Sequence, residues 1–226
     1  MRPEPESKRA IIFVDGQNLF AAIKDCFGYT YPNYDIKSLA WAVAGPQGWT
    51  VVETRFYTGI PNAEKDPFWH GFWKRKLTAM ERANIRTYAR ELRYRRKAVR
   101  DAQGIPVLDL QGQQLNLEVR QEKGVDMRIA LDIVRLAQQE RYDVAILFSQ
   151  DQDFTEVAKE IRSLAREQDR WIKIASAFPT DPSRPYSRGI DRTDWLPFDR
   201  TTYDACIDPM DYGTPMRDED YEPTVE

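Results

Sequence analysis

Two short runs of branched and aromatic residues constrain the fold more than any other feature of the chain. Ala10 to Val14 (AIIFV) and Val144 to Phe148 (VAILF) are apolar at every position. A strand that is apolar on both faces is typical of the interior of a parallel sheet, which has helices packed on each side. Each run is followed at once by polar residues and then by a helical pattern. The sequence therefore predicts an α/β fold with a buried parallel sheet.

The rest of the chain continues this alternation of strands and helices. Gly and Pro interrupt the periodicity between segments, and Asp35 is expected to cap a helix. The stretch VLDLQGQQLNLEV predicts an inserted β-hairpin that turns near Gly112. The predicted helices are 19–26, 36–43, 67–83, 126–139 and 154–166, and the predicted strands are 10–14, 50–57, 85–88, 143–148 and 171–177. This order predicts a Rossmann-like parallel sheet with helices on both faces.

Four aspartates are expected at one edge of this sheet. Asp15 ends the first apolar run, Asp151 and Asp153 follow the second, and Asp126 opens a predicted helix. The carboxyl ends of parallel strands form a ligand crevice where the strand order reverses. Carboxylates in one crevice repel each other unless protons or a cation neutralise them. Oxygen ligands without nearby Cys or His favour Mg²⁺ or Mn²⁺, so the pattern predicts a metal site for a phosphate ester.

Each of these aspartates also has a simpler interpretation. Aspartate is common after strands and at helix N-caps, where its side chain accepts a backbone N–H. Asp153 could cap the helix that begins near Phe154, and Asp132 is expected to be a solvated or capping carboxylate. The simpler interpretation loses weight because four aspartates are expected together at one edge of the sheet.

Three motifs carry a resemblance to a known family. They are FVDGQNLF (Phe13 to Phe20), EKGVDMRIALDIV (Glu122 to Val134) and ILFSQDQDF (Ile146 to Phe154). In this order and at these separations they resemble the NYN domain family, the LabA-like branch of the PIN-like nucleases, over roughly residues 9–178. The resemblance implies a Rossmann-like (PIN-like) sheet and hydrolysis of RNA phosphodiesters that depends on Mg²⁺ or Mn²⁺.

The resemblance also implies roles for particular residues. Its acidic positions, catalytic and metal-binding, are Asp15, Asp126, Asp151 and Asp153. Asn18, one turn into the first helix, and Ser149, ahead of the acidic pair, would orient a water or a phosphate oxygen. Gln150 departs from the family pattern, which usually has Gly between the Ser and the first Asp. A side chain at that turn is expected to restrict φ or crowd the metal.

Length and composition agree with one domain. The 226 residues are 42% hydrophobic and 31% charged, enough for a full core and a charged surface. Residues 1–8 are expected to be disordered, 9–198 to form the nuclease domain and 199–226 to be an acidic flexible tail. No apolar run approaches a membrane span and no apolar signal segment opens the chain, so a cytoplasmic location away from membranes is expected. Cys26 and Cys206 are expected to be reduced rather than disulfide-bonded.

The net charge of −3 hides two segregated clusters. From Lys74 to Arg100 eleven basic residues stand against two acidic ones, and from Asp199 to Glu226 nine acidic residues stand against two basic ones. A basic run is often only a solvated face, but interleaving with Tyr88 and Tyr94 favours a surface for single-stranded nucleic acid. The resemblance selects RNA. The expected RNA contacts are Lys123, Arg90, Arg93, Arg95, Arg96 and Lys97.

These observations together predict a metal-dependent ribonuclease, in which one or two Mg²⁺ or Mn²⁺ ions activate a water. The alternative is a catalytically weak or inactive RNA-binding regulatory module with the same fold, and Gln150 motivates it. A small-molecule phosphohydrolase with a phospho-aspartate is disfavoured, because Gln17 stands where it needs a second Asp. The RNA class, the mode of cleavage and the oligomeric state, including a homo-oligomer, stay open.

Overall fold

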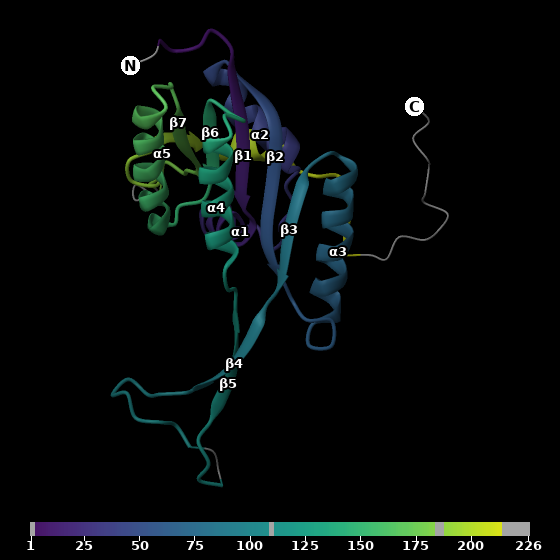
Figure 1. Ribbon diagram of the computed structural model, residues 1–226. Coiled ribbons are helices and arrows are strands. Elements are labelled where there is room, and N and C mark those ends of the chain that lie inside the picture. Colours follow the sequence, from purple (N-terminus) through teal and green to yellow (C-terminus); the bar gives the residue numbers. More distant parts are fainter. Residues whose placement is uncertain (1–2, 109–110, 184–187, 214–226) are drawn as a thin grey trace.

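A six-stranded sheet forms the centre of the molecule (Figure 1). The computed structural model describes residues 3–108, 111–183 and 188–213. All neighbouring strands of this sheet are parallel, in the order β3-β2-β1-β6-β7-β8. The strands are β1 (Lys8–Asp15), β2 (Trp49–Ile60), β3 (Arg86–Glu91), β6 (Val144–Phe148), β7 (Lys173–Pro179) and β8 (Asp194–Phe198). The order runs outward from β1 and β6, so the predicted parallel sheet is confirmed and its switch point lies between these two strands.

Helices cover both faces because alternate residues of a strand point to opposite sides. In β1, Ile12 and Val14 join one core cluster, and Ile11 and Phe13 join the other. The first cluster packs under α1, α2 and α3, and the second packs under α4 and α5, which Figure 1 shows on the near side of the sheet. The helices are α1 (Gly16–Phe27), α2 (Ile36–Ala44), α3 (Pro67–Arg82), α4 (Val125–Gln138) and α5 (Thr155–Glu167), with 3₁₀ turns at Gly45–Gln47 and Gln152–Phe154.

The predicted elements of the sheet and its covering helices are present, and no end is displaced by more than three residues. Asp35 caps α2 as predicted, since its Oδ1 accepts the backbone N–H of Lys37 at 3.0 Å. In the part of the chain that the structure describes, no helix combines the length and the apolar character of a membrane-spanning segment.

A two-stranded antiparallel arm leaves the sheet between β3 and α4 and extends away from the body (Figure 1). Its strands are β4 (Arg93–Ala98) and β5 (Asn116–Gln121). The prediction placed both strands of a hairpin within 107–119. The bridge from Leu108 to Gln114 does bracket a turn there, but β5 pairs with the basic stretch. Four cations and one aromatic in β4 show no apolar alternation, so the sequence pattern could not reveal this strand. Residues 109–110 of the predicted turn lie outside the described residues.

The chain remains folded beyond the boundary predicted at residue 198. Helix α6 (Arg200–Asp204) follows β8, and Tyr203, Cys206 and Tyr212 are buried in the first core cluster. The acidic composition of this segment concealed the few apolar side chains that hold it. Residues 214–226, the rest of the predicted tail, lie outside the described residues. At the other end, Lys8 already belongs to β1, so the predicted disordered segment 1–8 is also too long.

A buried ion pair fastens this C-terminal segment to α3. The Lys76 side chain is 1% exposed, and its Nζ donates to Asp208 Oδ2 at 3.1 Å and to the Tyr34 carbonyl oxygen at 2.9 Å. The rings of Tyr34 and Tyr212 lie 5.3 and 4.7 Å from the same nitrogen. Burial lowers the pKa of Lys76, and Asp208 opposes that change. A buried ammonium group is costly without a counter-charge, so Asp208 anchors the segment.

Asp208→Asn is expected to lower the free energy of unfolding by about 3 kcal/mol, because it leaves the Lys76 ammonium buried without its partner. Urea unfolding at neutral pH measures this change. Asp194→Asn is the matched control, since Asp194 pairs with Lys173 at the surface and such pairs contribute at most about 1 kcal/mol. Equal losses in the two variants would contradict the anchoring role.

Candidate metal centre

Three carboxylates meet at the carboxyl end of β1. Asp15 is the last residue of β1, Asp126 lies in the first turn of α4, and Glu122 follows β5 directly. One side-chain oxygen of each lies within 4.8 Å of the others. Among residues 3–108, 111–183 and 188–213, this is the only such group of three His, Cys, Asp or Glu side chains. It lies beside the switch point of the sheet, where α/β folds bind ligands.

Asp15 is the most strongly perturbed member of the group. Burial raises the pKa of Asp15 to about 7, and the nearby charge of Asp126 adds to the rise. Two hydrogen bonds oppose it: the backbone N–H of Asn18 donates to Oδ1 at 3.1 Å, and the Ser149 hydroxyl donates to Oδ2 at 3.4 Å. The Asp15 carboxylate therefore has two roles: it caps α1, and it lies close to the carboxylates of Glu122 and Asp126.

Glu122 and Asp126 are also held against their ionised form. Burial raises the pKa of Glu122 to about 7, with repulsion from Asp15 as the next cause. Burial raises the pKa of Asp126 as well, and the charges of Asp151 and Asp153 raise it further. Without a cation the group retains protons near neutral pH. A divalent cation would relieve the same repulsion, so the group has the electrostatics of a metal site.

Glu122 is the residue of this group that the sequence analysis missed. Its Oε2 accepts the Gly59 N–H at 2.7 Å, which ties the root of the arm to the end of β2. A Cβ on Gly59 would lie 2.6 Å from that oxygen and 2.3 Å from Leu92 Cδ2, so only glycine fits there. The available signal was the spacing in EKGVD, where Gly124, at φ +81°, turns the chain from Glu122 toward Asp126.

The two other predicted aspartates lie at the margin of the group. Asp151 Oδ1 accepts the Asp153 N–H at 3.0 Å, so Asp151 caps the 3₁₀ turn that follows β6. The capping interpretation therefore applies to Asp151, while Asp153 is exposed on the turn. Both are close enough to raise the pKa of Asp126, but neither belongs to the group of three.

Ser149 and Asn18 join the loop after β6 to β1 and α1. Besides its bond to Asp15, the Ser149 Oγ accepts the Asp151 N–H at 3.2 Å. The side-chain oxygen of Asn18 accepts the Gln150 N–H at 2.9 Å. Both side chains therefore hold the loop in place around Asp15.

Gln150 occupies its turn without needing the conformations of glycine. The described non-glycine residues with positive φ are Asn84, Glu140, Asp169 and Arg192, and Gln150 is not among them. Its side-chain Nε2 donates to the carbonyl oxygen of Arg188 at 2.8 Å. The structure thus removes the backbone reason for expecting an impaired site, and the effect of Gln150 on activity stays a prediction.

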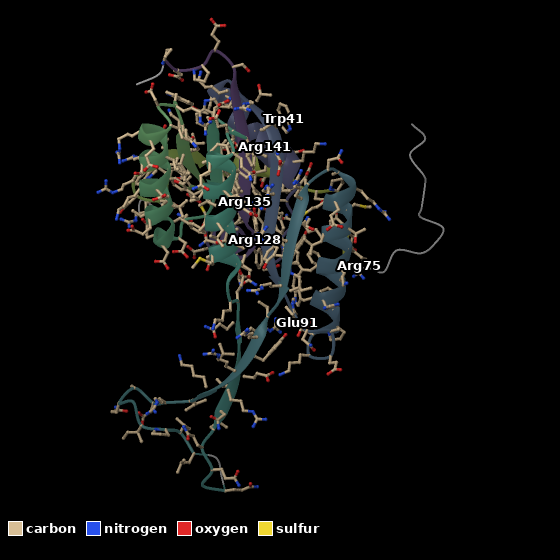
Figure 2. All side chains as sticks on the ribbon, in the orientation of Figure 1. Trp41, Arg75, Glu91, Arg128, Arg135 and Arg141 are labelled. Carbon is tan, nitrogen blue, oxygen red and sulfur yellow. The ribbon has the colours of Figure 1, made fainter. Side chains whose placement is uncertain are left out.

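Asp132 is buried on α4, which corrects the expectation of a solvated or capping carboxylate. It is 3% exposed and accepts hydrogen bonds at 2.9 to 3.2 Å from Tyr57, Arg55, Arg128 and Arg135. Figure 2 shows Arg128 and Arg135 along α4. Arg55 and Tyr57 come from β2, so no local pattern could reveal this pairing. The network fixes α4 against β2 and with it the position of Asp126.

The arm divides its basic residues between two faces, since directly opposed residues of an antiparallel pair share a face and neighbours alternate. One face carries Arg93, Arg95 and Lys97 together with Leu117 and Val119. All five are exposed, and Leu117 is 60% exposed.

The opposite face of the arm packs toward the loop before α3. Tyr94 Oη accepts the Asn62 N–H at 3.0 Å, and Arg120 Nη2 donates to Asp66 Oδ2 at 2.6 Å. Arg96 shares this face, so it does not continue the row formed by the other basic residues of β4.

Arg90 and Lys123 lie at the root of the arm. Arg90 Nη1 donates to the carbonyl oxygen of Lys123 at 3.1 Å. The Lys123 side chain is exposed directly after Glu122. The structure therefore brings these two predicted RNA contacts together directly after Glu122 of the acidic group.

Comparison with known proteins assigns the family. The family model described as the NYN domain matches residues 9–168. The chain belongs to the NYN domain family. This family consists of PIN-like nucleases that act on RNA. The LabA-like branch stays a prediction, because the match is to the NYN domain as a whole.

Two solved structures resemble the chain weakly. A protein of unknown function from Vibrio parahaemolyticus is 20% identical, with 92% of this chain and 93% of that chain covered and a TM-score of 0.43. A deacetylase–teicoplanin complex from teicoplanin biosynthesis is 10% identical, with 74% and 68% covered and a TM-score of 0.27. Neither likeness carries an argument about this chain. No curated protein sequence matches it.

The metal-free protein is expected to lose stability as pH rises from about 4 to about 7. In this window Asp15 keeps the proton that the unfolded chain releases near its ordinary pKa of 3.8, so the unfolded state binds fewer protons and stability falls with pH. The full shift of Asp15 to about 7 corresponds to roughly 4 kcal/mol. Asp15→Asn keeps a capping side chain and removes this penalty, so at pH 8 the variant should be the more stable protein.

Urea unfolding in EDTA between pH 4.5 and 8 measures this difference, with the exposed Glu160→Gln as control. A variant that is several kcal/mol less stable at every pH would show that Asp15 acts mainly as a structural cap.

Proposed function

We propose that the chain is a divalent-metal-dependent ribonuclease that hydrolyses phosphodiester bonds of single-stranded RNA. The observation that carries the proposal is the convergence of Asp15, Glu122 and Asp126 within 4.8 Å at the switch point of the sheet. Membership of a nuclease family supports hydrolysis of a phosphodiester. A cytoplasmic location and homo-oligomerisation remain predictions beside it.

The residues of the group fit a hard cation. All donor atoms are carboxylate oxygens, and burial and repulsion from nearby carboxylates raise the pKa of each member. Such a donor set favours Mg²⁺ or Mn²⁺ over softer metals. When bound, the cation lowers the pKa of a coordinated water and stabilises the charge that develops on the phosphate. Asp15, Glu122 and Asp126 would hold it.

The remaining predicted residues have supporting roles in the proposal. Ser149 favours the ionised form of Asp15 by donating a hydrogen bond to it, and Asn18 holds the loop after β6 through Gln150. Asp151 and Asp153 flank Asp126, where they would accept hydrogen bonds from water and orient it for attack.

The arm supplies the second part of the proposal, which is RNA affinity. Arg93, Arg95 and Lys97 form an exposed cationic row on β4 beside Leu117 and Val119 of β5. Arg90 and Lys123 lie at the root of the arm, and Arg96 is on its opposite face. Backbone phosphates gain affinity from such cations, and single strands can also lay their bases on apolar side chains. The arm joins the acidic group directly through Glu122, so a strand bound along it would lead to the site.

Cleavage of mixed single-stranded RNAs is expected with Mn²⁺ or Mg²⁺ and not with EDTA. Glu122→Gln and Asp126→Asn should each lower kcat/KM by more than about 100-fold, beyond the effect of a merely supporting residue. Glu118→Gln, a carboxylate on the arm that pairs with Lys65, is the matched control and should retain activity. RNA binding without cleavage in any metal would overturn the proposal in favour of the regulatory binding module.

Changing Arg93, Arg95 and Lys97 together to Ala should flatten the dependence of RNA affinity on salt. Each lost phosphate contact reduces the slope of log K against log salt by about 0.7 for a single strand, so the triple change removes about two units. Fluorescence anisotropy over a salt series measures the slope. Lys37, Arg141 and Lys159, exposed cations away from the arm, form the control triple. An unchanged slope would mean that the cationic row is only a solvated face and does not bind RNA.

A further inference from the structure

A pocket of about 390 Å³ lies between α1, α3 and the root of the arm. Its volume falls within the range of sites for small organic groups. Its lining includes Gln17, Phe20, Lys24, Gly59, Trp69 and Arg120. They come from α1, α3, the end of β2 and β5, which are separated in sequence and meet only in the folded chain.

The pocket shares a wall with the acidic group. Gln17 lies two residues after Asp15, and its Nε2 donates to the carbonyl oxygen of Gly59 at 3.3 Å. Gly59 in turn binds Glu122 through its N–H. A group in the pocket would therefore be separated from the carboxylates by one side chain and one stretch of backbone.

The pocket presents an aromatic ring that the core does not use. Among the described residues Phe20 is half-buried, belongs to neither core cluster and stacks on no other ring. Trp69, on the α3 wall, is fixed edge-on against Phe72 with ring centroids 5.1 Å apart. The free face of Phe20 can stack on a flat aromatic ligand, and the Trp69 ring forms a rigid wall beside it.

The rim of the pocket is cationic. In the described part of the chain Lys24 has no carboxylate partner, and Arg120 shares its charge with Asp66. With three acidic side chains on the other side of the wall, two cations at the rim fit a ligand whose aromatic part enters while its phosphates stay outside.

We infer that this pocket holds one unpaired base of the RNA, belonging to a nucleotide beside the scissile phosphate. The inference rests on the proposed function and deepens it, since it makes single-strandedness a requirement at one position. A base within a duplex is stacked and paired, so it could not enter without being turned out of the helix. Phe20 supplies the stacking face, and Lys24 and Arg120 hold the flanking phosphates.

A series of labelled single-stranded RNAs, each with one abasic nucleotide at a successive position, tests the inference. Binding is measured by fluorescence anisotropy in EDTA, and cleavage is measured with Mn²⁺. Loss of the base at one position should weaken binding by about 5- to 140-fold, which is the value of one stacked base. In Phe20→Ala the same abasic substitution should have little further effect on binding, because the stacking of the base on the Phe20 ring is already lost. Phe20→Tyr should restore the wild-type pattern.

Trp41→Ala is the control, since Trp41 is an exposed aromatic on α2 (Figure 2) and is not among the residues that line the pocket. Equal sensitivity to base loss at every position, or a Phe20→Ala protein that keeps the single sensitive position, would overturn the pocket assignment and leave the nuclease proposal intact. A position-specific effect on binding without cleavage in any metal would overturn the nuclease proposal and keep the pocket. Failure to bind any RNA would overturn both.

Discussion

Burial of carboxylates close to one another at the end of the central strand is the constraint on which the site depends. Asp15 is buried because β1 lies in the middle of the sheet, and burial raises its pKa to about 7. Glu122 and Asp126 approach the same point and compete for the same protons. The free energy stored in this arrangement is available to any cation that replaces the protons. This edge of the sheet therefore lowers the stability of the metal-free protein, as is common at functional sites.

One face of β2 positions two members of the acidic group. Arg55, Tyr57 and Gly59 alternate along the strand, so they point to the same side. Arg55 and Tyr57 bind Asp132 and fix α4, while Gly59 binds Glu122 and leaves room for its side chain. The Arg55–Asp132 ion pair and the Tyr57 hydroxyl thus position Asp126 relative to Asp15. The missing side chain of Gly59 does the same for Glu122. The pairing of Asp132 with several donors also compensates its burial, which an unpaired carboxylate could not tolerate.

The chain keeps its acidic and basic chemistry apart. The acidic group lies at the edge of the sheet, and the cationic row lies on an arm that leaves the body (Figure 1). The arm nevertheless begins at Leu92 and ends at Glu122, beside the pocket and the carboxylates. Among the described residues no ion pair joins the cationic row to the acidic group, so the positive charge of the arm can attract a polyanion.

The sequence by itself determined five of the six strands of the sheet and two of the three members of the acidic group. The two apolar runs could only be buried as parallel strands, and Asp15 had to fall at their carboxyl edge. Asp126 could be placed by its position at the start of a helix. These conclusions needed only periodicity and the rule that parallel strands end at one edge.

Tertiary structure alone decided the rest. Glu122 joins the group because Gly59, far away in sequence, offers an N–H and no side chain. Asp132 is buried because β2 brings Arg55 and Tyr57 to it. The partner of β5 and the burial of Tyr203 also depend on residues distant along the chain. Local patterns report which faces are apolar, but long-range pairing depends on which surfaces meet, and that is decided only when the whole chain packs.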